Sequence, residues 1–493
     1  MTYHAIILTD VITEYRTKPL GAYTVANVLR MQGYKVLVID YISKIDIQEL
    51  LSLLKKFITK DTLFLGYSST FFPAIGYSNP PIFPLPYDNI RLINQTAKDL
   101  NPSISVLIGG VYARRLTTYN LENNDTLGFT HVMYGFAEVM IVDFTKSLEQ
   151  KRIPRFSNKS NGLYVIEYNV TSDGFDFKNY KHIWDETDFV FQNEALPIEL
   201  GRGCIFKCKF CAYPLVGKDP RDTSYIRDEE VLLAEVLENY ERFKTTTYLV
   251  VDDTFNERDE KLEVLLRVRD RSKLDLNFTG YNRIDLIARR PRQLSMLKDL
   301  NFNGLFFGIE SMNYESAKAI GKGIKPAEIT ETLHKIRDAF NNKLTISAGF
   351  IIGLPYETPE TFYKWFREVQ DPNYPIDSVI LNYLGIYKTS TSSSDFYDNP
   401  EKFGYTVTPN TTMWKNDIWD SEICKSIAVE ERRNMIINSR LTLNNFEIAS
   451  FPILGYPFET MLKTKYPFCR QSDYIERKQS VITEYFNKLK NLS

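Results

Sequence analysis

The stretch Pro197–Cys211, PIELGRGCIFKCKFC, places three cysteines directly after a short apolar run of strand length. Cys204, Cys208 and Cys211 are separated by four and then three positions. A structural zinc site normally has four ligands, and the two other cysteines of the chain lie far downstream. A closed zinc site would therefore need a distant ligand. Cysteine thiolates also hold cubane iron–sulfur clusters, and three of them would leave one iron of such a cluster open.

Residues 1–150, upstream of the cysteines, alternate between apolar runs of strand length and segments with helical periodicity, beginning with AIILT at 5–9. Strands separated by helices indicate a parallel sheet that is covered on both faces. We therefore predict a Rossmann-like α/β domain over residues 1–150. Ligands of such sheets bind at the carboxyl ends of the strands, which here are followed by loops after Thr9, Ser69 and Gly110.

Residues 196–390 repeat the alternation with a longer period, in six predicted strand–helix units. Six units fit a partial TIM-type parallel barrel better than a complete eightfold one. Residues 151–195 are polar and rich in turn residues, so we expect a linker with at most one hairpin. Residues 391–493 are expected to be mainly helical and to pack on the rest of the chain through aromatic side chains such as Trp414 and Trp419.

The composition is that of a globular protein, with 43% hydrophobic and 25% charged residues. A formal net charge of -2 gives no overall attraction to nucleic acid or to an anionic membrane. The sequence has no apolar run long enough for a transmembrane helix and no signal-peptide pattern at its start. Five cysteines, three of them crowded together, do not suggest a disulfide framework, so we expect a cytoplasmic protein.

The C-x3-C-x2-C pattern, with Phe210 before its last cysteine, resembles the radical S-adenosylmethionine (SAM) superfamily. Four further motifs stand where that superfamily binds SAM: VDDTFN at 251–256, GYNRIDLI at 280–287, FFGIES at 306–311 and GFIIGLPYET at 349–358. The resemblance is closest to the subgroup with an N-terminal cobalamin-binding (flavodoxin-like) domain. It is carried there by SST at 68–70, GG at 109–110 and GFAE at 135–138.

The resemblance implies that Cys204, Cys208 and Cys211 ligate three irons of a [4Fe-4S] cluster. The amino and carboxylate groups of SAM would chelate the fourth iron. Reductive cleavage of SAM would then yield a 5'-deoxyadenosyl radical for C–H activation, and the subgroup favours cobalamin-dependent methyl transfer to an unactivated carbon. Such an enzyme needs a reductant protein, for example flavodoxin or ferredoxin.

The resemblance also assigns candidate SAM-binding residues, each with a plainer alternative. Asp252 and Asp253 would meet the amino group of SAM, or cap the next helix. Glu310 would bind the ribose, or form a structural salt bridge. Arg283 is a candidate for a SAM or substrate contact. The remaining candidates are residues that would lie along the adenine or shield the cluster: Phe210, Gly349, Ile351 and Gly353, the last of which could also belong to an ordinary turn.

The first domain departs from the pattern D-x-H-x-x-G, with which many cobalamin domains supply a histidine to cobalt. The corresponding segment, LTDVITEYRTKPLGA, has Asp10 and Gly21 but no histidine. We therefore expect cobalamin, if it binds, to bind without a histidine ligand. The residues that would line its nucleotide tail are small or carry hydroxyl groups: Ser68, Ser69, Thr70, Gly109 and Gly110. The alternative is a degenerate domain that only braces the barrel.

Two other functions remain open at this point. One is a radical SAM enzyme without cobalamin that performs a rearrangement, a ring closure or an oxidation. The other is a non-catalytic metal-binding or electron-transfer protein, which would not need the four motifs at the strand ends. No recognisable RNA-binding module or basic tail points to nucleic acid, and no segment identifies the substrate.

Overall fold

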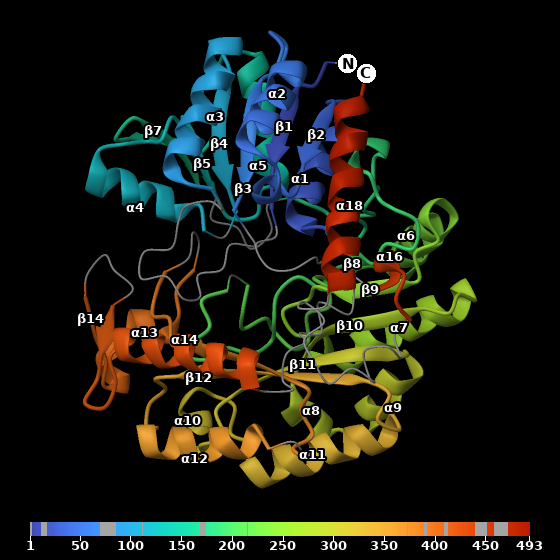
Figure 1. Cartoon of the computed structure of the whole chain (residues 1–493), viewed down its shortest axis with the longest axis vertical. Coiled ribbons are helices and arrows are strands. Elements are labelled where there is room, and N and C mark those ends of the chain that lie inside the picture. The colour runs from blue at the N-terminus through green and yellow to red at the C-terminus, as the bar shows by residue number, and fades with distance from the viewer. Residues whose placement is uncertain are drawn as a thin grey trace.

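The computed structural model describes residues 2–10, 17–69, 85–110, 112–167, 174–213, 215–371, 373–388, 392–408, 413–438, 451–457 and 472–493. Within these ranges two parallel-dominated sheets form the protein, one above the other in Figure 1. This arrangement and a helical C-terminal region confirm the predicted α/β fold class. None of the described helices has both the length and the apolar character needed to span a membrane.

The first sheet contains seven strands in the order β2-β1-β3-β4-β5-β7-β6. Its first five strands have the flavodoxin-like order, in which ligands bind where the order reverses, between β1 and β3. The strands are β1 (Ala5–Leu8), β2 (Val36–Ile39), β3 (Phe64–Ser68), β4 (Ser105–Gly109), β5 (His131–Tyr134), β6 (Ser157–Ser160) and β7 (Leu163–Glu167). The helices between them are α1 (Leu20–Met31), α2 (Ile47–Phe57), α3 (Tyr87–Leu100), α4 (Arg114–Asn123) and α5 (Glu138–Glu149), with the short 3-10 turn η1 (Ile42–Lys44).

The predicted linker differs from the structure in its first part. The hairpin β6–β7 extends the first sheet, because β7 pairs in parallel with β5 from His131↔Tyr164 onward. Leu163 and Ile166 are buried on it, so the hairpin also covers an edge that would otherwise be open. The later part, with the 3-10 turn η2 (Glu186–Asp188), has no strand among its described residues, but Trp184 packs against Tyr23 at 5.0 Å within the main core.

The second sheet has six parallel strands in sequential order, as a partial barrel requires. They are β8 (Leu196–Ile198), β9 (Thr247–Val250), β10 (Asn277–Asn282), β11 (Phe302–Glu310), β12 (Thr345–Ile352) and β13 (Ser378–Tyr383). The outer layer consists of α6 (Glu229–Phe243), α7 (Asp259–Ser272), α8 (Ile284–Arg289), α9 (Arg292–Asp299), α10 (Tyr314–Ala319), α11 (Pro326–Ala339) and α12 (Pro359–Val369), with η3 (Phe255–Glu257) after β9. All eight residues of β12 are buried, which explains its continuous apolar run.

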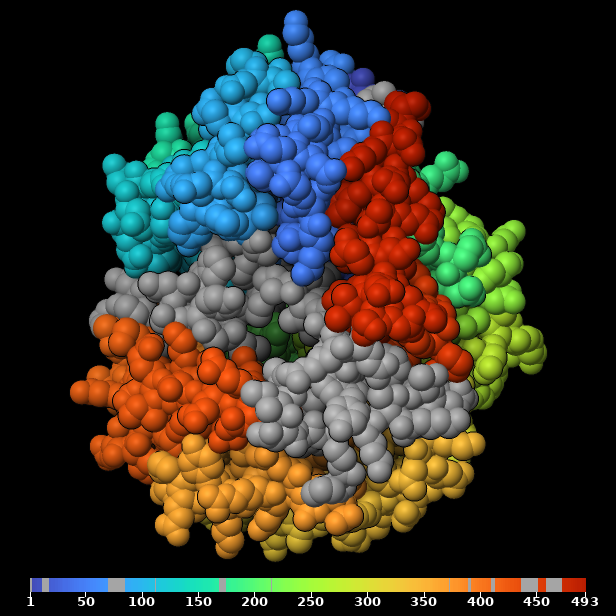
Figure 2. Space-filling model, viewed as in Figure 1, coloured from blue at the N-terminus to red at the C-terminus, as the bar shows by residue number. Residues whose placement is uncertain are grey.

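The C-terminal region contacts both sheets. Its elements are α13 (Asp395–Asp398), η4 (Pro400–Phe403), β14 (Thr406–Val407), β15 (Trp414–Lys415), α14 (Ser421–Asn438), α16 (Phe451–Leu454) and α18 (Ser472–Asn491). Helix α18 lies against the first domain in Figures 1 and 2. Ile482, Tyr485 and Leu489 of this helix belong to the core of that domain, and the Tyr485 hydroxyl accepts a hydrogen bond from the backbone amide of Asp40 at 2.9 Å.

Candidate functional site

The three cysteines lie in the loop that follows β8. Cys204 is buried and Cys208 and Cys211 are half-buried. Burial raises the pKa of both the Cys204 and the Cys211 thiol to about 12. The charge of Cys208 acts on the pKa of Cys211, and the guanidinium of Arg283 interacts electrostatically with both Cys204 and Cys208. The three sulfurs therefore share one electrostatic neighbourhood.

Asp252, a candidate for the SAM amino group, is fully engaged by its own chain. Its carboxylate accepts hydrogen bonds from the backbone amides of Leu200 at 2.7 Å and Gly201 at 2.9 Å. It also forms a buried ion pair with Lys261 at 2.8 Å. Buried carboxylates need such partners, so Asp252 fixes the start of the cysteine loop, and its contact with SAM stays a prediction. Its neighbour Asp253 reaches solvent but lies among closely packed groups, and desolvation by these groups, with the charge of Asp252, raises its pKa to about 7.

Glu257 completes this buried network from the other side. It pairs with Lys261 at 2.9 Å, accepts a hydrogen bond from the backbone amide of Ile205 at 2.7 Å and another from the Tyr225 hydroxyl at 3.0 Å. The lysine thus joins two carboxylates that each hold one part of the loop. Sequence reasoning missed this network. The signal available was the pair Glu257 and Lys261, spaced four positions apart.

Glu310 ends β11 with a backbone φ of 70°, the left-handed region that non-glycine residues rarely adopt. Its carboxylate pairs with Lys322 at 2.9 Å, and Lys322 also donates to the backbone carbonyl of Gly308. The salt-bridge alternative for Glu310 is therefore present in the structure. Strained residues of this kind cluster at functional sites when the surroundings hold them, so Glu310 remains a candidate for the ribose.

Gly349 in β12 and Gly353 directly after it meet neighbours from their own chain. A Cβ on Gly353, where φ is +94°, would lie 2.5 Å from the Trp414 ring and 3.0 Å from the Cys424 sulfur. A Cβ on Gly349 would lie 3.0 Å from Phe306. At Gly353 the close approach is thus made by the C-terminal region, and a contact with adenine there stays a prediction. Ile351 is buried between these positions.

Phe210 is half-buried and packs against the main core, so its contact with a cofactor stays a prediction. Arg283 lies beside the cysteine loop, where its Nη1 donates to the Cys208 sulfur at 3.5 Å, and its contact with SAM or substrate stays a prediction. Among the described residues, no group of three or more His, Cys, Asp or Glu side chains is arranged to hold a single metal ion. Each thiolate of a cubane binds a different iron, so its sulfurs do not converge on one point as the ligands of a single ion do.

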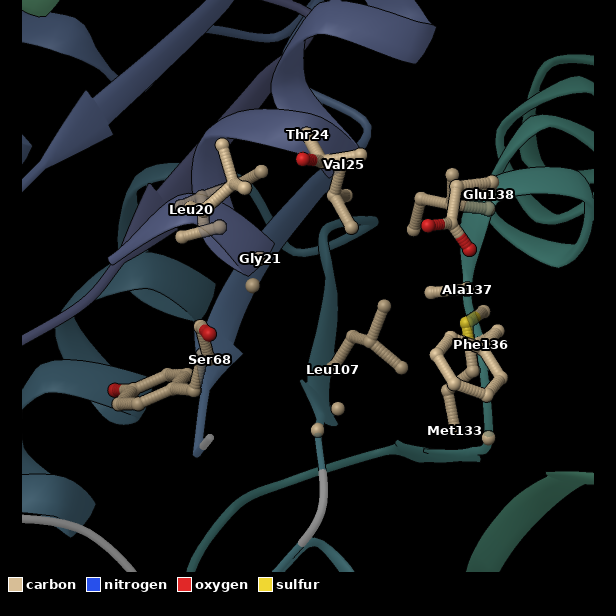
Figure 3. Close-up of a pocket in the computed structure, with 18 of the residues that line it drawn as sticks. Leu20, Gly21, Thr24, Val25, Ser68, Leu107, Met133, Phe136, Ala137 and Glu138 are labelled. Carbon is tan, nitrogen blue, oxygen red and sulfur yellow. The ribbon is translucent and has the colours of Figure 1, made fainter. Parts of the chain in front are cut away.

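A cavity of about 270 Å³ opens at the carboxyl ends of the first sheet. Ser68, Gly109 and Gly110, three of the residues predicted to line a nucleotide tail, border it. Ser69 is buried beside it and its hydroxyl donates to the carbonyl of Gly109 at 2.8 Å. Thr70 lies outside the described residues. Apolar side chains that the sequence did not single out point into the same space in Figure 3: Val25, Leu107, Met133 and Phe136.

Arg202 joins this cavity to the cysteine loop. It lies two residues before Cys204. Its guanidinium forms one ion pair with Glu138 of α5 at 2.6 Å and a second, through another nitrogen, with Glu199 at 2.9 Å. Glu138, Glu199 and Arg202 all line the cavity. The Arg202 guanidinium also lies over the Phe177 ring at 4.5 Å. Strand ends of both sheets therefore border one space, and the GFAE motif that ends in Glu138 meets the loop of the cysteines there.

Comparison with known proteins agrees with this architecture. Residues 198–369 match the radical SAM superfamily. A protein of Pyrococcus horikoshii named uncharacterized methyltransferase PH0819 is 26% identical over 69% of this chain and 71% of its own length. The hopanoid C-2 methylase of Rhodopseudomonas palustris is 25% identical over 37% of this chain and 34% of its own length.

Solved structures share the fold over nearly the whole chain. The radical SAM methyltransferase TsrM from Kitasatospora setae, solved with cobalamin and a [4Fe-4S] cluster, has a TM-score of 0.64 at 13% identity, over 97% of this chain and 100% of that one. The cobalamin-dependent radical SAM enzyme OxsB has a TM-score of 0.59 at 13% identity, over 99% of this chain and 80% of that one. Residues 198–369 therefore form a radical SAM domain, the chain is an enzyme, and its two-sheet fold is that of the solved TsrM and OxsB structures.

Proposed function

We propose that this protein is a cobalamin-dependent radical SAM methyltransferase. The observation that carries the proposal is the cavity between the two rows of strand ends, which Arg202 and Glu138 tie to the cysteine loop. A domain that only braced the barrel would not need an apolar cavity at its own ligand-binding edge. The methyltransferases and the cobalamin enzymes among the similar proteins support the same reading.

The residues present fit an iron–sulfur cluster. Cys204, Cys208 and Cys211 supply three thiolates, the ligands that such clusters use, and Arg283 places a cation beside them. When bound, such a cluster would supply the electron for cleavage of SAM, and cobalamin would serve as the carrier of the methyl group. The chain's own part is to hold the loop rigid through Lys261 and its two carboxylates and to keep the cysteines out of bulk water.

For SAM, the structure favours a smaller set of candidates than the sequence did. Asp253 has an exposed carboxylate at the end of β9 and suits a cationic amino group. Glu310 stands at the end of β11, two strands further along the same sheet, and suits the ribose hydroxyls. Asp252 and Gly353 are assigned structural tasks instead, for the reasons given above.

For cobalamin, the cavity has the character of a site for the nucleotide base. Its volume of about 270 Å³ lies just under the usual range for pockets that hold small molecules, about 300–1,000 Å³, so it suits one aromatic group and not the whole cofactor. Its walls are mainly apolar side chains with glycines that leave room for a ring. No histidine is among its lining residues, so we propose cobalamin binding without a histidine ligand.

The proposal is tested by anaerobic reconstitution with iron, sulfide and hydroxocobalamin, followed by desalting. We expect retained corrin absorbance close to one equivalent. Incubation with SAM and dithionite in the presence of candidate substrates should then release S-adenosylhomocysteine beside 5'-deoxyadenosine. Absence of retained corrin, with 5'-deoxyadenosine as the sole product of SAM, would refute methyl transfer and favour the alternative of a cobalamin-independent radical SAM rearrangement, ring closure or oxidation.

A further inference from the structure

Two hydrogen bonds of its backbone fix Arg283 at the end of β10, independently of the contacts of its side chain. Its amide donates to Asn256 Oδ1 at 2.7 Å, and the Asn256 side-chain amide donates to its carbonyl at 3.0 Å. Both residues are buried. The reciprocal pair fixes the position from which the Arg283 side chain starts, next to the cysteine loop.

The guanidinium of Arg283 is then restrained on three sides. Asp285 accepts two parallel hydrogen bonds from Nε and Nη2, each at 2.9 Å. The Phe206 ring, which belongs to the cysteine loop, lies 3.8 Å from the guanidinium carbon. The remaining nitrogen, Nη1, donates to the sulfur of Cys208 at 3.5 Å. A planar fork that is bound on one edge can aim its other N–H in only one direction.

This arrangement is more than charge compensation. Asp285 already neutralises the buried guanidinium, and an ion pair through a single nitrogen would do so without fixing the direction of Nη1. The chain instead uses Phe206 and Asp285 together to direct Nη1 at a cysteine sulfur. Hydrogen bonds to the sulfurs of an iron–sulfur cluster are among the features that set its reduction potential, and second-sphere donors also orient the ligands.

We propose that Arg283 is a positioning residue that holds the sulfur of Cys208 and makes the cluster easier to reduce. The proposal rests on the proposed function, because it requires the cluster. Reduction adds one electron and one negative charge to the cluster. A directed N–H on a ligand sulfur stabilises the more negative, reduced form more than the oxidised form. Its loss therefore lowers the reduction potential.

The test uses the anaerobically reconstituted full-length enzyme and two variants. Arg283→Lys keeps the cation but removes the planar fork. The double variant Arg283→Gln with Asp285→Asn removes the pair together, so that no buried charge is left alone. A matched control is Arg30→Gln with Asp188→Asn: Arg30 and Asp188 form a similar bidentate pair at 2.8 Å, and it joins the first domain to the η2 turn, away from the cysteines.

Iron and sulfide content are measured first, and the reduction potential is then read by EPR during titration with dithionite. We expect both Arg283 variants to shift to a more negative potential while the Arg30 control keeps that of the wild type. A tenfold weaker reduction corresponds to a shift of about 59 mV for one electron. If only the Arg283 variants lose the cluster, while the Arg30 control keeps it, the result would also support the contact, because it would show that Arg283 helps Cys208 to bind the cluster.

Three results would overturn the proposal, and they are distinguishable. A full cluster with an unchanged potential in both Arg283 variants refutes the role of Arg283 and leaves the proposed function standing. A wild-type protein that assembles no iron–sulfur cluster refutes both. A shift of the Arg30 control equal to that of the Arg283 variants also refutes the specific contact, because it would trace the effect to general loosening of the fold.

Discussion

Asp252 and Asp253 are adjacent carboxylates for which we propose different tasks. Asp252→Asn should destabilise the fold, and Asp253→Asn should weaken SAM binding without destabilising it. The two variants make the same chemical change at neighbouring positions, so each is the control for the other. This contrast tests whether the burial and contacts of the two side chains, rather than their shared position at the end of β9, decide what they do.

The size of the first effect follows from three contacts. Asp252 accepts from Leu200 and Gly201 and pairs with Lys261 at 2.8 Å, all buried. An asparagine there loses the charge and turns an NH2 group toward donors. Breaking a buried pair in this way costs about 3–5 kcal/mol. An exposed change such as Asp253→Asn alters stability by no more than about 0.5 kcal/mol, while loss of a charged hydrogen bond to the SAM ammonium costs about 1.5–3 kcal/mol, or roughly 10- to 150-fold in affinity.

Stability is measured on the apo protein by urea unfolding followed by circular dichroism, and affinity by equilibrium binding of SAM to the anaerobically reconstituted protein. Asp252→Asn should unfold at a lower urea concentration than the wild type and should incorporate less iron, because the cysteine loop loses its anchor. Wild-type stability in Asp252→Asn would refute the network argument. Wild-type SAM affinity in Asp253→Asn would refute the binding role.

Three further changes test other parts of the structure. Because desolvation by the surrounding groups and the charge of Asp252 raise the pKa of Asp253 to about 7 although its side chain reaches solvent, the carboxylate loses its charge as the pH falls through that value. SAM affinity measured from about pH 8 down to about pH 6 should therefore drop, and Asp253→Asn should flatten the profile. Gly109→Leu should fill the cavity and reduce retained hydroxocobalamin at least about tenfold, while the unfolding transition stays unchanged. Gly109→Ala is the control, because its added Cβ meets nothing closer than 3.9 Å, and it should retain hydroxocobalamin like the wild type. Equal retention by the two variants would contradict the assigned site. Gly353→Ala combines a left-handed φ with a clash against Trp414 and should therefore reduce the stability of the fold more than Gly321→Ala does. Gly321→Ala is the control: its added Cβ meets nothing within 4 Å, so only the backbone strain of roughly 1 kcal/mol is expected. Equal shifts of the thermal midpoint would show that the Trp414 contact is unimportant.

Much of the architecture was predictable because it depends on local patterns. Apolar runs of strand length separated by amphipathic segments determined a parallel sheet in each half, and β12, buried along its whole length, is the clearest case. The hairpin β6–β7 was not assigned to a sheet, because its partner β5 is specified by the edge that the first domain leaves open and not by any residue in the hairpin. The packing of α18 on the first domain could not be predicted from the sequence either, because its partners lie more than 400 positions away.

By itself, the sequence determined that three thiols follow the first strand of a parallel barrel and that polar or small residues stand at successive strand ends, because spacing along one chain encodes both. Only the tertiary structure decided which of those side chains are already engaged by other residues of the protein and which can contact a bound molecule. The sequence cannot distinguish Asp252 from Asp253, because both are aspartates at the same strand end. In the structure the buried Lys261, nine positions after Asp252, forms an ion pair with Asp252, while the Asp253 side chain reaches solvent. Arg283 is likewise a strand-end arginine until Asp285 and Phe206 aim it at a sulfur, because direction and burial are properties of the packed molecule.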